Sequence, residues 1–261
     1  MRISAIIMPF VAIVAGVAGF YLRLQEQWNV FKDGLPDRGA VITIVLISLS
    51  AAFLLAALAF ALRASRKHKV ETGFENAFGT DQLSYPIALS IIGAVWLGAT
   101  VMRFVEVNSS GDFSQIDLVF LITSALSAVS IAFFAIEMYQ NPRSRIAIAL
   151  SIVPTLHMCF WLILMYRQNA PNPILLSYAY FCLAIITSTL GFYFTSGFAY
   201  NKPAPGKAIF SYLSAIYFCF VTMADSHAFG IEIIMAALVA INTVYASMLI
   251  KNLRWKERDN L

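Results

Sequence analysis

The residues best suited to chemistry in this sequence are charged side chains that recur at the ends of apolar segments. Arg23 precedes Glu26 by three residues, Arg103 precedes Glu106 by the same spacing, and a third apolar segment ends at Arg167. Arginine can bind a carboxylate or a phosphate through two parallel hydrogen bonds. Local pairing on a helix, worth about 0.2–0.5 kcal/mol, is the alternative. The pattern therefore predicts either separate local interactions or one shared site for an anionic or polar ligand.

One titratable residue lies near the middle of an apolar segment. His157 follows Pro154 by three residues, and a proline inside a helix leaves a backbone carbonyl without its usual partner. Ionisable residues in membrane segments are costly, and they are functional candidates by default. His157 is predicted either to carry a proton or contact a substrate, or to be a neutral imidazole bonded inside the protein. The other two histidines, His68 and His227, fall in predicted loops, so a haem with two histidine ligands is not expected.

A loop near the C-terminus combines carboxylates with an imidazole. Asp225, His227 and Glu232 are possible metal ligands, or an acid–base pair for a membrane hydrolase. Zinc sites use three or four ligands in fixed geometry, and this spacing matches none of the established zinc motifs. The sequence also contains no G-x-S-x-G, H-E-x-x-H, C-x-x-C or G-x-x-x-x-G-K motif. We therefore predict a polar loop, with no metal, no cofactor and no nucleotide hydrolysis by this chain.

Charged residues are scarce because the chain is unusually apolar. Of its 261 residues, 60% are in the set AVILMFWYC, 12% are charged, and the mean hydropathy is +0.75. A soluble domain carries about 25% charged residues. Half that charge cannot cover a surface that faces water, and three cysteines are too few for a disulfide-stapled secreted domain. The composition is that of an integral membrane protein.

Eight apolar stretches are long enough to cross a bilayer as helices, which takes about 20 residues each. The seventh is the weakest, because it is short and rich in tyrosine and serine. The first also resembles a secretory signal with a small-residue cleavage site, and its removal would leave seven. We predict an all-α transmembrane bundle that forms one domain over residues 1–261, with spans at residues 3–22, 40–62, 85–102, 118–136, 146–166, 174–198, 208–224 and 231–250.

The distribution of lysine and arginine predicts the orientation. Most of the 18 fall on the side that carries both chain ends, and cytoplasmic loops retain such residues. Both termini are therefore expected in the cytoplasm, with the protein in the cell membrane. The net charge of +4 then reflects topology and does not indicate nucleic-acid binding. The longest loop on that side, residues 63–84, is predicted to lie solvated on anionic headgroups or to dock a cytoplasmic partner.

Weak internal repeats accompany this map. The arginine at the ends of the first and third spans indicates a repeated helical hairpin, and the internal prolines Pro9 and Pro154 indicate two similar halves, as in some transporters. Glu232 is the only charged residue within the eight windows, at an edge. Coupled carriers of charged solutes usually need a charge near the midplane, so coupled transport of a strongly charged solute is disfavoured.

These observations predict a permease or transporter-type protein with an outward-facing polar vestibule for a small polar or amphiphilic solute. The candidate substrate-binding residues are Arg23, Glu26, Arg103, Glu106, Arg167 and His157. One alternative is a non-catalytic structural or assembly subunit of a membrane complex, which would need partner subunits. The other is a membrane-embedded enzyme that uses His157 or the Asp225 and His227 pair.

Overall fold

The computed structural model describes residues 3–29, 31–32, 35–36, 41–70, 73–111, 113–140, 145–171 and 175–255. Within these ranges the chain is helical apart from turns and short antiparallel pairings of β1 (Phe31–Lys32) with β2 (Leu35–Pro36) and of β3 (His68–Lys69) with β4 (Arg254–Trp255). The predicted all-α class is confirmed. The helices are α1 (Ser4–Asn29), α2 (Val41–Lys67), α3 (Phe74–Phe78), α4 (Ser84–Ser110), α5 (Gln115–Gln140), α6 (Arg145–Leu150), α7 (Val153–Asn169), α8 (Leu175–Ala199), α9 (Pro205–Thr222) and α10 (Phe229–Asn252).

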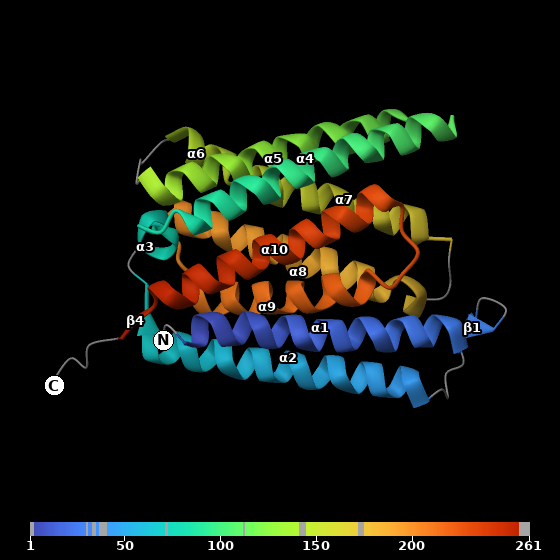
Figure 1. Ribbon diagram of the computed structural model, residues 1–261, viewed down its shortest axis with the longest axis horizontal. Helices are drawn as coiled ribbons and strands as arrows, with labels where there is room; N and C mark the ends of the chain where they lie inside the picture. The colour runs from blue at the N-terminus through green and yellow to red at the C-terminus, as the bar shows by residue number, and fades with distance from the viewer. Residues whose placement is uncertain are drawn as a thin grey trace.

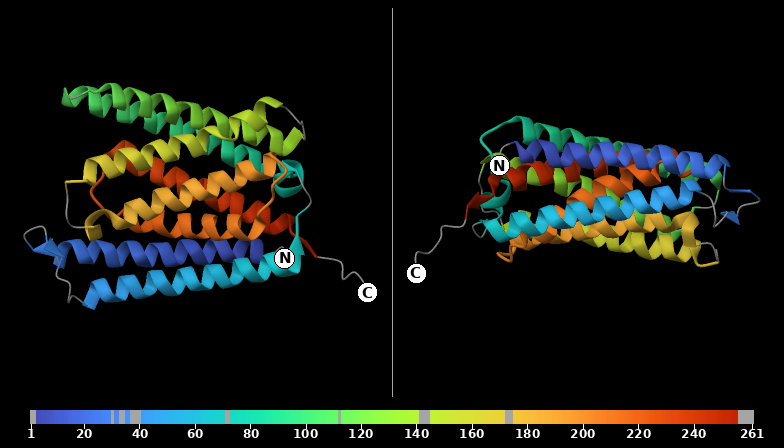
Figure 2. Two further views of the ribbon diagram at one scale, coloured as in Figure 1. Left: turned by 180° about the vertical axis from the view of Figure 1, so that it is seen from behind. Right: turned by 90° about the horizontal axis from the view of Figure 1, so that it is seen from below.

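The long helices run side by side in one bundle, and both chain ends lie at the same end of it (Figures 1 and 2). We call this the terminal end and the opposite one the Arg23 end. Helices α1 and α2 form one flank and α4 and α5 the other, with α7 to α10 between them (Figure 1). Among the described residues, seven helices are long and apolar enough to cross a membrane. The chain is therefore a multi-pass membrane protein by the length and composition of its helices.

Helix α9, which corresponds to the predicted seventh span, is not among those seven. It runs through the bundle and packs against α1, α2, α8 and α10 (Figure 1). Its tyrosines are fully buried, and they bond to neighbouring helices: Tyr212 Oη lies 2.6 Å from Thr195 Oγ1, and Tyr217 Oη lies 2.8 Å from Ser50 Oγ. A helix enclosed by protein does not need a lipid-facing surface, which explains its modest hydropathy. The eighth span stays a prediction.

The predicted span at residues 146–166 is interrupted. Helices α6 and α7 are separated by a turn at Ser151 and Ile152, although residues 148–169 together are long and apolar enough to span. Pro154 lies in the first turn of α7, where its missing N–H costs nothing. The hydroxyl of Ser196 donates to the carbonyl of Ser151 over 2.6 Å. Pro9, by contrast, lies inside the continuous helix α1, so the two prolines occupy different positions in their helices.

The segment at residues 63–84 is not simply a solvated loop, and this part of the prediction is wrong. Helix α2 continues to Lys67, and α3 then folds back against the end of the bundle. Phe78 is fully buried, with its ring 5.4 Å from that of Phe198 and 5.5 Å from that of Tyr245. The side-chain amide of Asn252 donates to two backbone carbonyls at the end of α3. Docking of a cytoplasmic partner on this segment stays a prediction.

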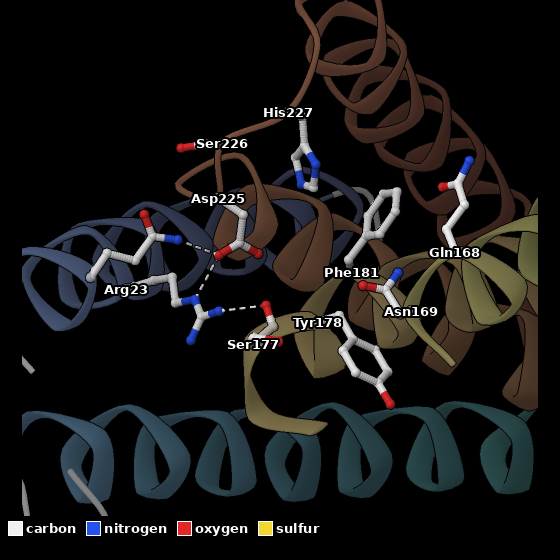
Figure 3. A pocket seen from close by; sticks show the side chains of 10 residues that line it. Arg23, Gln168, Asn169, Ser177, Tyr178, Phe181, Asp225, Ser226 and His227 are labelled. Atoms are coloured by element: carbon white, nitrogen blue, oxygen red, sulfur yellow. Dashed lines mark hydrogen bonds and ion pairs between the residues drawn. The ribbon is translucent and has the colours of Figure 1, made fainter. Parts of the chain in front are cut away.

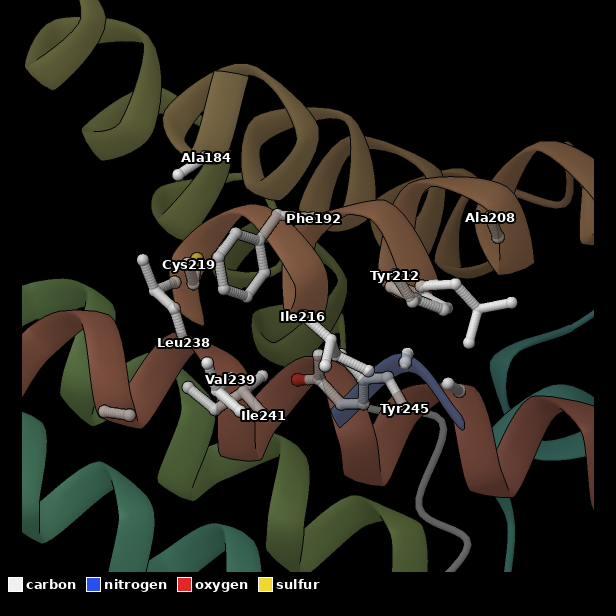
Figure 4. Close-up of a cluster of buried hydrophobic side chains, with 14 of the residues drawn as sticks. Ala184, Phe192, Ala208, Tyr212, Ile216, Cys219, Leu238, Val239, Ile241 and Tyr245 are labelled. Atoms are coloured by element: carbon white, nitrogen blue, oxygen red, sulfur yellow. The ribbon is translucent and has the colours of Figure 1, made fainter. Parts of the chain in front are cut away.

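Large buried side chains of α8, α9 and α10 pack together in the core. Figure 4 shows Phe192, Ile216 and Tyr245 projecting between these helices from three sides. Helix α1 approaches α9 closely at Gly19, where an added Cβ would lie 2.6 Å from Val221 Cγ2. Glycine is therefore required there by space. This buried core supports the loop between α9 and α10 at the Arg23 end.

Candidate functional site

A buried ion network lies at the Arg23 end (Figure 3). Arg23 Nε donates to Asp225 Oδ1 over 2.8 Å, and Arg23 Nη1 donates to Glu26 Oε2 over 2.7 Å. The exposed fractions are 1% for Arg23, 0% for Glu26 and 8% for Asp225. Charges this deeply buried are tolerated only when they are paired and hydrogen-bonded. The network therefore ties α1 to the loop that joins α9 and α10.

Further polar groups complete this network. Thr43 Oγ1 donates to Glu26 Oε1 over 2.6 Å, and Gln27 Nε2 donates to Asp225 Oδ1 over 2.6 Å. Arg23 Nη2 donates to the backbone carbonyl of Ser177 over 3.0 Å, and the guanidinium carbon lies 5.3 Å from the ring centroid of Tyr180. The guanidinium is thus engaged by α1, α8 and the α9–α10 loop together. Its geometry is that of a structural ion pair.

A cavity of about 490 Å³ opens beside this network. Figure 3 shows Arg23 and Asp225 on one side of it and the aromatic ring of Phe181 on another. Polar and aromatic side chains from α1, α7, α8 and the α9–α10 loop line it: Arg23, Gln27, Gln168, Asn169, Ser177, Tyr178, Phe181, Asp225, Ser226 and His227. Neither the volume nor this lining could be inferred from the sequence, because the residues come from four separate segments.

A second cavity of about 200 Å³ adjoins the first, and the two share Gln168, Phe181, Ser226 and His227. We call the two cavities together the vestibule. Arg103 and Asp117 line the second cavity, whose walls also include Phe120 and Trp161. Arg103 Nη1 donates to Glu106 Oε2 over 3.4 Å, and Glu106 Oε1 accepts a hydrogen bond from the backbone N–H of Gly230.

The predicted arginines do not converge on one point. Arg23 lines the first cavity and Arg103 the second, whereas Arg167 is exposed and is not among the residues that line either. Both Arg23 and Arg103 make the local pair that their spacing allows. Because all three nitrogens of Arg23 are engaged, a ligand carboxylate or phosphate would have to displace a protein carboxylate from this arginine.

The described charges of the vestibule favour cations over anions. Those that line it or pair with its arginines are two arginines and four carboxylates, namely Arg23, Arg103, Glu26, Glu106, Asp117 and Asp225. The excess of negative charge repels an anionic ligand. Aromatic rings along the wall can stabilise a cationic group through their negative faces.

His227 stands on the wall shared by the two cavities. Burial lowers its pKa from the ordinary value, and the nearby carboxylate of Asp225 opposes part of this shift. Its Nε2 lies 3.2 Å from the hydroxyl of Thr222, and that hydroxyl also donates to Asp225 Oδ2 over 3.1 Å. Thr222 is fully buried, so it cannot meet a substrate as a nucleophile. The described residues include no three His, Cys, Asp or Glu side chains that could hold a metal ion. Glu232 lies in the first turn of α10, and its charge also acts on His227.

His157 lies behind the wall of the second cavity. Its Nδ1 is 3.0 Å from Thr123 Oγ1, and its ring centroid lies 5.1 Å from that of Phe120 and 5.9 Å from that of Trp161. Both aromatic residues line the vestibule. His157 Nε2 is buried and has no hydrogen-bond partner among the described residues. The imidazole is therefore separated from the vestibule by side chains alone.

Several residues of this site carry no sequence signal. Thr43 and Gln27 are ordinary polar residues at helix ends, and Phe181 and Trp161 are ordinary aromatics in apolar segments. The fold and the site together define a multi-pass helical membrane protein with a polar vestibule at one end. No protein family, curated protein or solved structure matches this chain.

Proposed function

We propose that this chain is a permease-type protein of the cell membrane whose vestibule takes up a small polar or amphiphilic solute. The observation that carries the proposal is the pair of adjoining cavities of about 490 and 200 Å³ at the Arg23 end. Small-molecule sites have volumes of about 300–1,000 Å³ and combine apolar walls with a few fixed polar groups. The buried Arg23 network fixes such groups, because its members bond to one another across several helices.

The solute that occupies the vestibule is expected to be uncharged, zwitterionic or cationic. The excess of carboxylates at the vestibule disfavours a net negative charge, and Tyr178, Phe181 and Trp161 offer aromatic faces. We further propose that the route inward passes Phe120 and Trp161 toward His157. Their side chains would have to change rotamer to open it, as in other gated sites.

The orientation is part of the proposal. Lysine and arginine predominate on the loops at the terminal end, and we place that end in the cytoplasm, with eight spans that include α9. The vestibule then faces outward. Labelling of Ser226→Cys in intact cells by a membrane-impermeant thiol reagent tests this orientation, because Ser226 is exposed at the vestibule. Protection from the reagent until the membrane is opened would place the vestibule on the inside.

Osmotic reswelling of vesicles tests transport without knowledge of the natural solute. Purified protein in liposomes is mixed rapidly with hyperosmotic glycerol, glycine betaine or sodium lactate, with gramicidin present to carry sodium. The vesicles shrink and then reswell only as the solute enters, which light scattering records. We expect glycerol or glycine betaine to enter faster than in protein-free vesicles, and lactate to enter no faster.

Two variants connect any flux to the vestibule. Ser226→Trp places an indole where the two cavities join, and it should slow entry to the rate of protein-free vesicles. Asn108→Trp adds the same group to an exposed position on α4 outside both cavities, and it should have no effect. Rates equal to those of protein-free vesicles for every solute, with folded protein, would overturn the proposal in favour of a structural or assembly subunit.

A further inference from the structure

A second candidate site lies at the terminal end, opposite the vestibule. Cavities of about 640 and 400 Å³ adjoin there and share Phe194 and Lys207. They run along the outside of the bundle, where α9 begins and α8 and α2 end. We call them together the lysine groove.

The lysine groove carries positive charge without a matching carboxylate. Lys202 and Lys207 are exposed and line its larger cavity, and no aspartate or glutamate is among the lining residues of either cavity. The turn between the helices places both lysines. Asn201 adopts a left-handed conformation (φ 57°) that ends α8, and Lys202 N donates to the carbonyl of Gly197 over 2.7 Å. Pro205 then starts α9, so the two lysines flank one tight connection.

The rest of the groove is apolar and open. Leu156 is 61% exposed and Tyr193 is 58% exposed, and both belong to helices that are long and apolar enough to span the membrane. In a spanning protein such surface faces acyl chains. The groove thus has two ammonium groups at the end of an apolar channel. The ammonium groups suit an anionic lipid headgroup, and the apolar channel suits its acyl chains.

A hydroxyl supports this reading. Thr155 lines the larger cavity beside Leu156, and its Oγ1 is buried with no hydrogen-bond partner among the described residues. A buried hydroxyl that lacks a partner costs free energy. A turn of this side chain toward the cavity would let an ester or phosphate oxygen accept its hydrogen bond.

We propose that the lysine groove binds an anionic phospholipid. The phosphate lies between Lys202 and Lys207, and an acyl chain follows Leu156 and Tyr193 along the groove. Anionic lipids are concentrated in the cytoplasmic leaflet, which is where the lysine and arginine distribution places this end. The site is separate from the vestibule and does not depend on transport.

Lipid binding to the purified protein tests the proposal. Native mass spectrometry of the full chain, released from detergent micelles, measures the dissociation constants of phosphatidylglycerol and phosphatidylcholine. We expect phosphatidylglycerol to bind more tightly. The double variant Lys202→Gln/Lys207→Gln should weaken it roughly 30-fold, at about five- to sixfold for each lysine. Lys202→Arg/Lys207→Arg should stay close to the parent, since it keeps the charge.

A matched control separates this site from general surface charge. Arg63 and Arg66 are exposed near the end of α2 at the same end of the bundle and line neither cavity. Arg63→Gln/Arg66→Gln therefore removes the same charge and should change the affinity less than threefold. An equal loss in this control, equal binding of both lipids by the parent, or displacement of the lipid by soluble glycerol phosphate would each overturn the proposal.

Discussion

Replacement of Arg23 by glutamine tests whether the arginines of the vestibule are structural pairs or free ligand donors. Arg23 is 1% exposed and donates to Asp225, Glu26 and the carbonyl of Ser177. Arg23→Gln removes the cation from these bonds and leaves the carboxylates of Glu26 and Asp225 buried without it. Loss of one partner from a buried ion pair costs about 3–5 kcal/mol, because the remaining charge is uncompensated.

Arg103 provides the matched comparison, since it has the same spacing to a glutamate. Its pair with Glu106 is longer, at 3.4 Å, and the two side chains are 27% and 30% exposed. Ion pairs that water reaches contribute about 0.2–1 kcal/mol. Arg103→Gln should therefore cost at least 2 kcal/mol less than Arg23→Gln, as the difference between these two ranges indicates.

Unfolding by sodium dodecyl sulfate in mixed micelles, followed by tryptophan fluorescence, measures both free energies. A double-mutant cycle sharpens the result: Asp225→Asn in the Arg23→Gln background should restore part of the stability, because it removes one unpaired carboxylate. Losses below about 1 kcal/mol for both arginines, with solute entry abolished, would refute the structural role and support direct capture of a ligand.

Three further perturbations probe other parts of the structure by the same unfolding assay. His227 has a lowered pKa in the folded protein, so stability should fall as the pH drops through about 6.5 toward that lower pKa, and His227→Gln should make this dependence shallower. Phe78→Ala should cost about 3–5 kcal/mol, because Phe78 is fully buried, and a loss below about 1 kcal/mol would contradict the packing of α3. Gly19→Leu would press on Val221 and should cost about 1–3 kcal/mol, whereas Gly98→Leu, with open space beside it, should cost far less.

The membrane-spanning helices were predictable because length and the absence of charge are local properties. The two Arg–Glu pairs were also predictable, since three residues on a helix bring side chains together. The difference in burial between the two pairs was not predictable. Arg23 is buried because Asp225, 202 residues away, reaches it from the α9–α10 loop, and no local pattern encodes that contact.

Helices α9 and α3 share one physical feature that their hydropathy does not show. High hydropathy identifies helices whose surface faces lipid, whereas α9 and α3 bury their surfaces against protein. Tyr212 and Tyr217 lower the hydropathy of α9, yet both are buried and bonded to neighbouring helices. Phe74 and Phe78 lie in a polar segment, so the sequence predicts a loop there. In the structure these side chains pack at the end of the bundle.

The charge distribution along the bundle restricts the solute further than the vestibule alone. Carboxylates outnumber arginines at the vestibule, so a cationic group is attracted there. Farther in, the predicted spans offer only neutral partners such as Thr123 and the partly unsatisfied imidazole of His157. A full positive charge would lose its hydration there without compensation, whereas a zwitterion or an uncharged polar solute loses less. We therefore expect tetramethylammonium to occupy the vestibule and slow the entry of glycine betaine without entering itself, and inhibition by lactate alone would contradict this assignment.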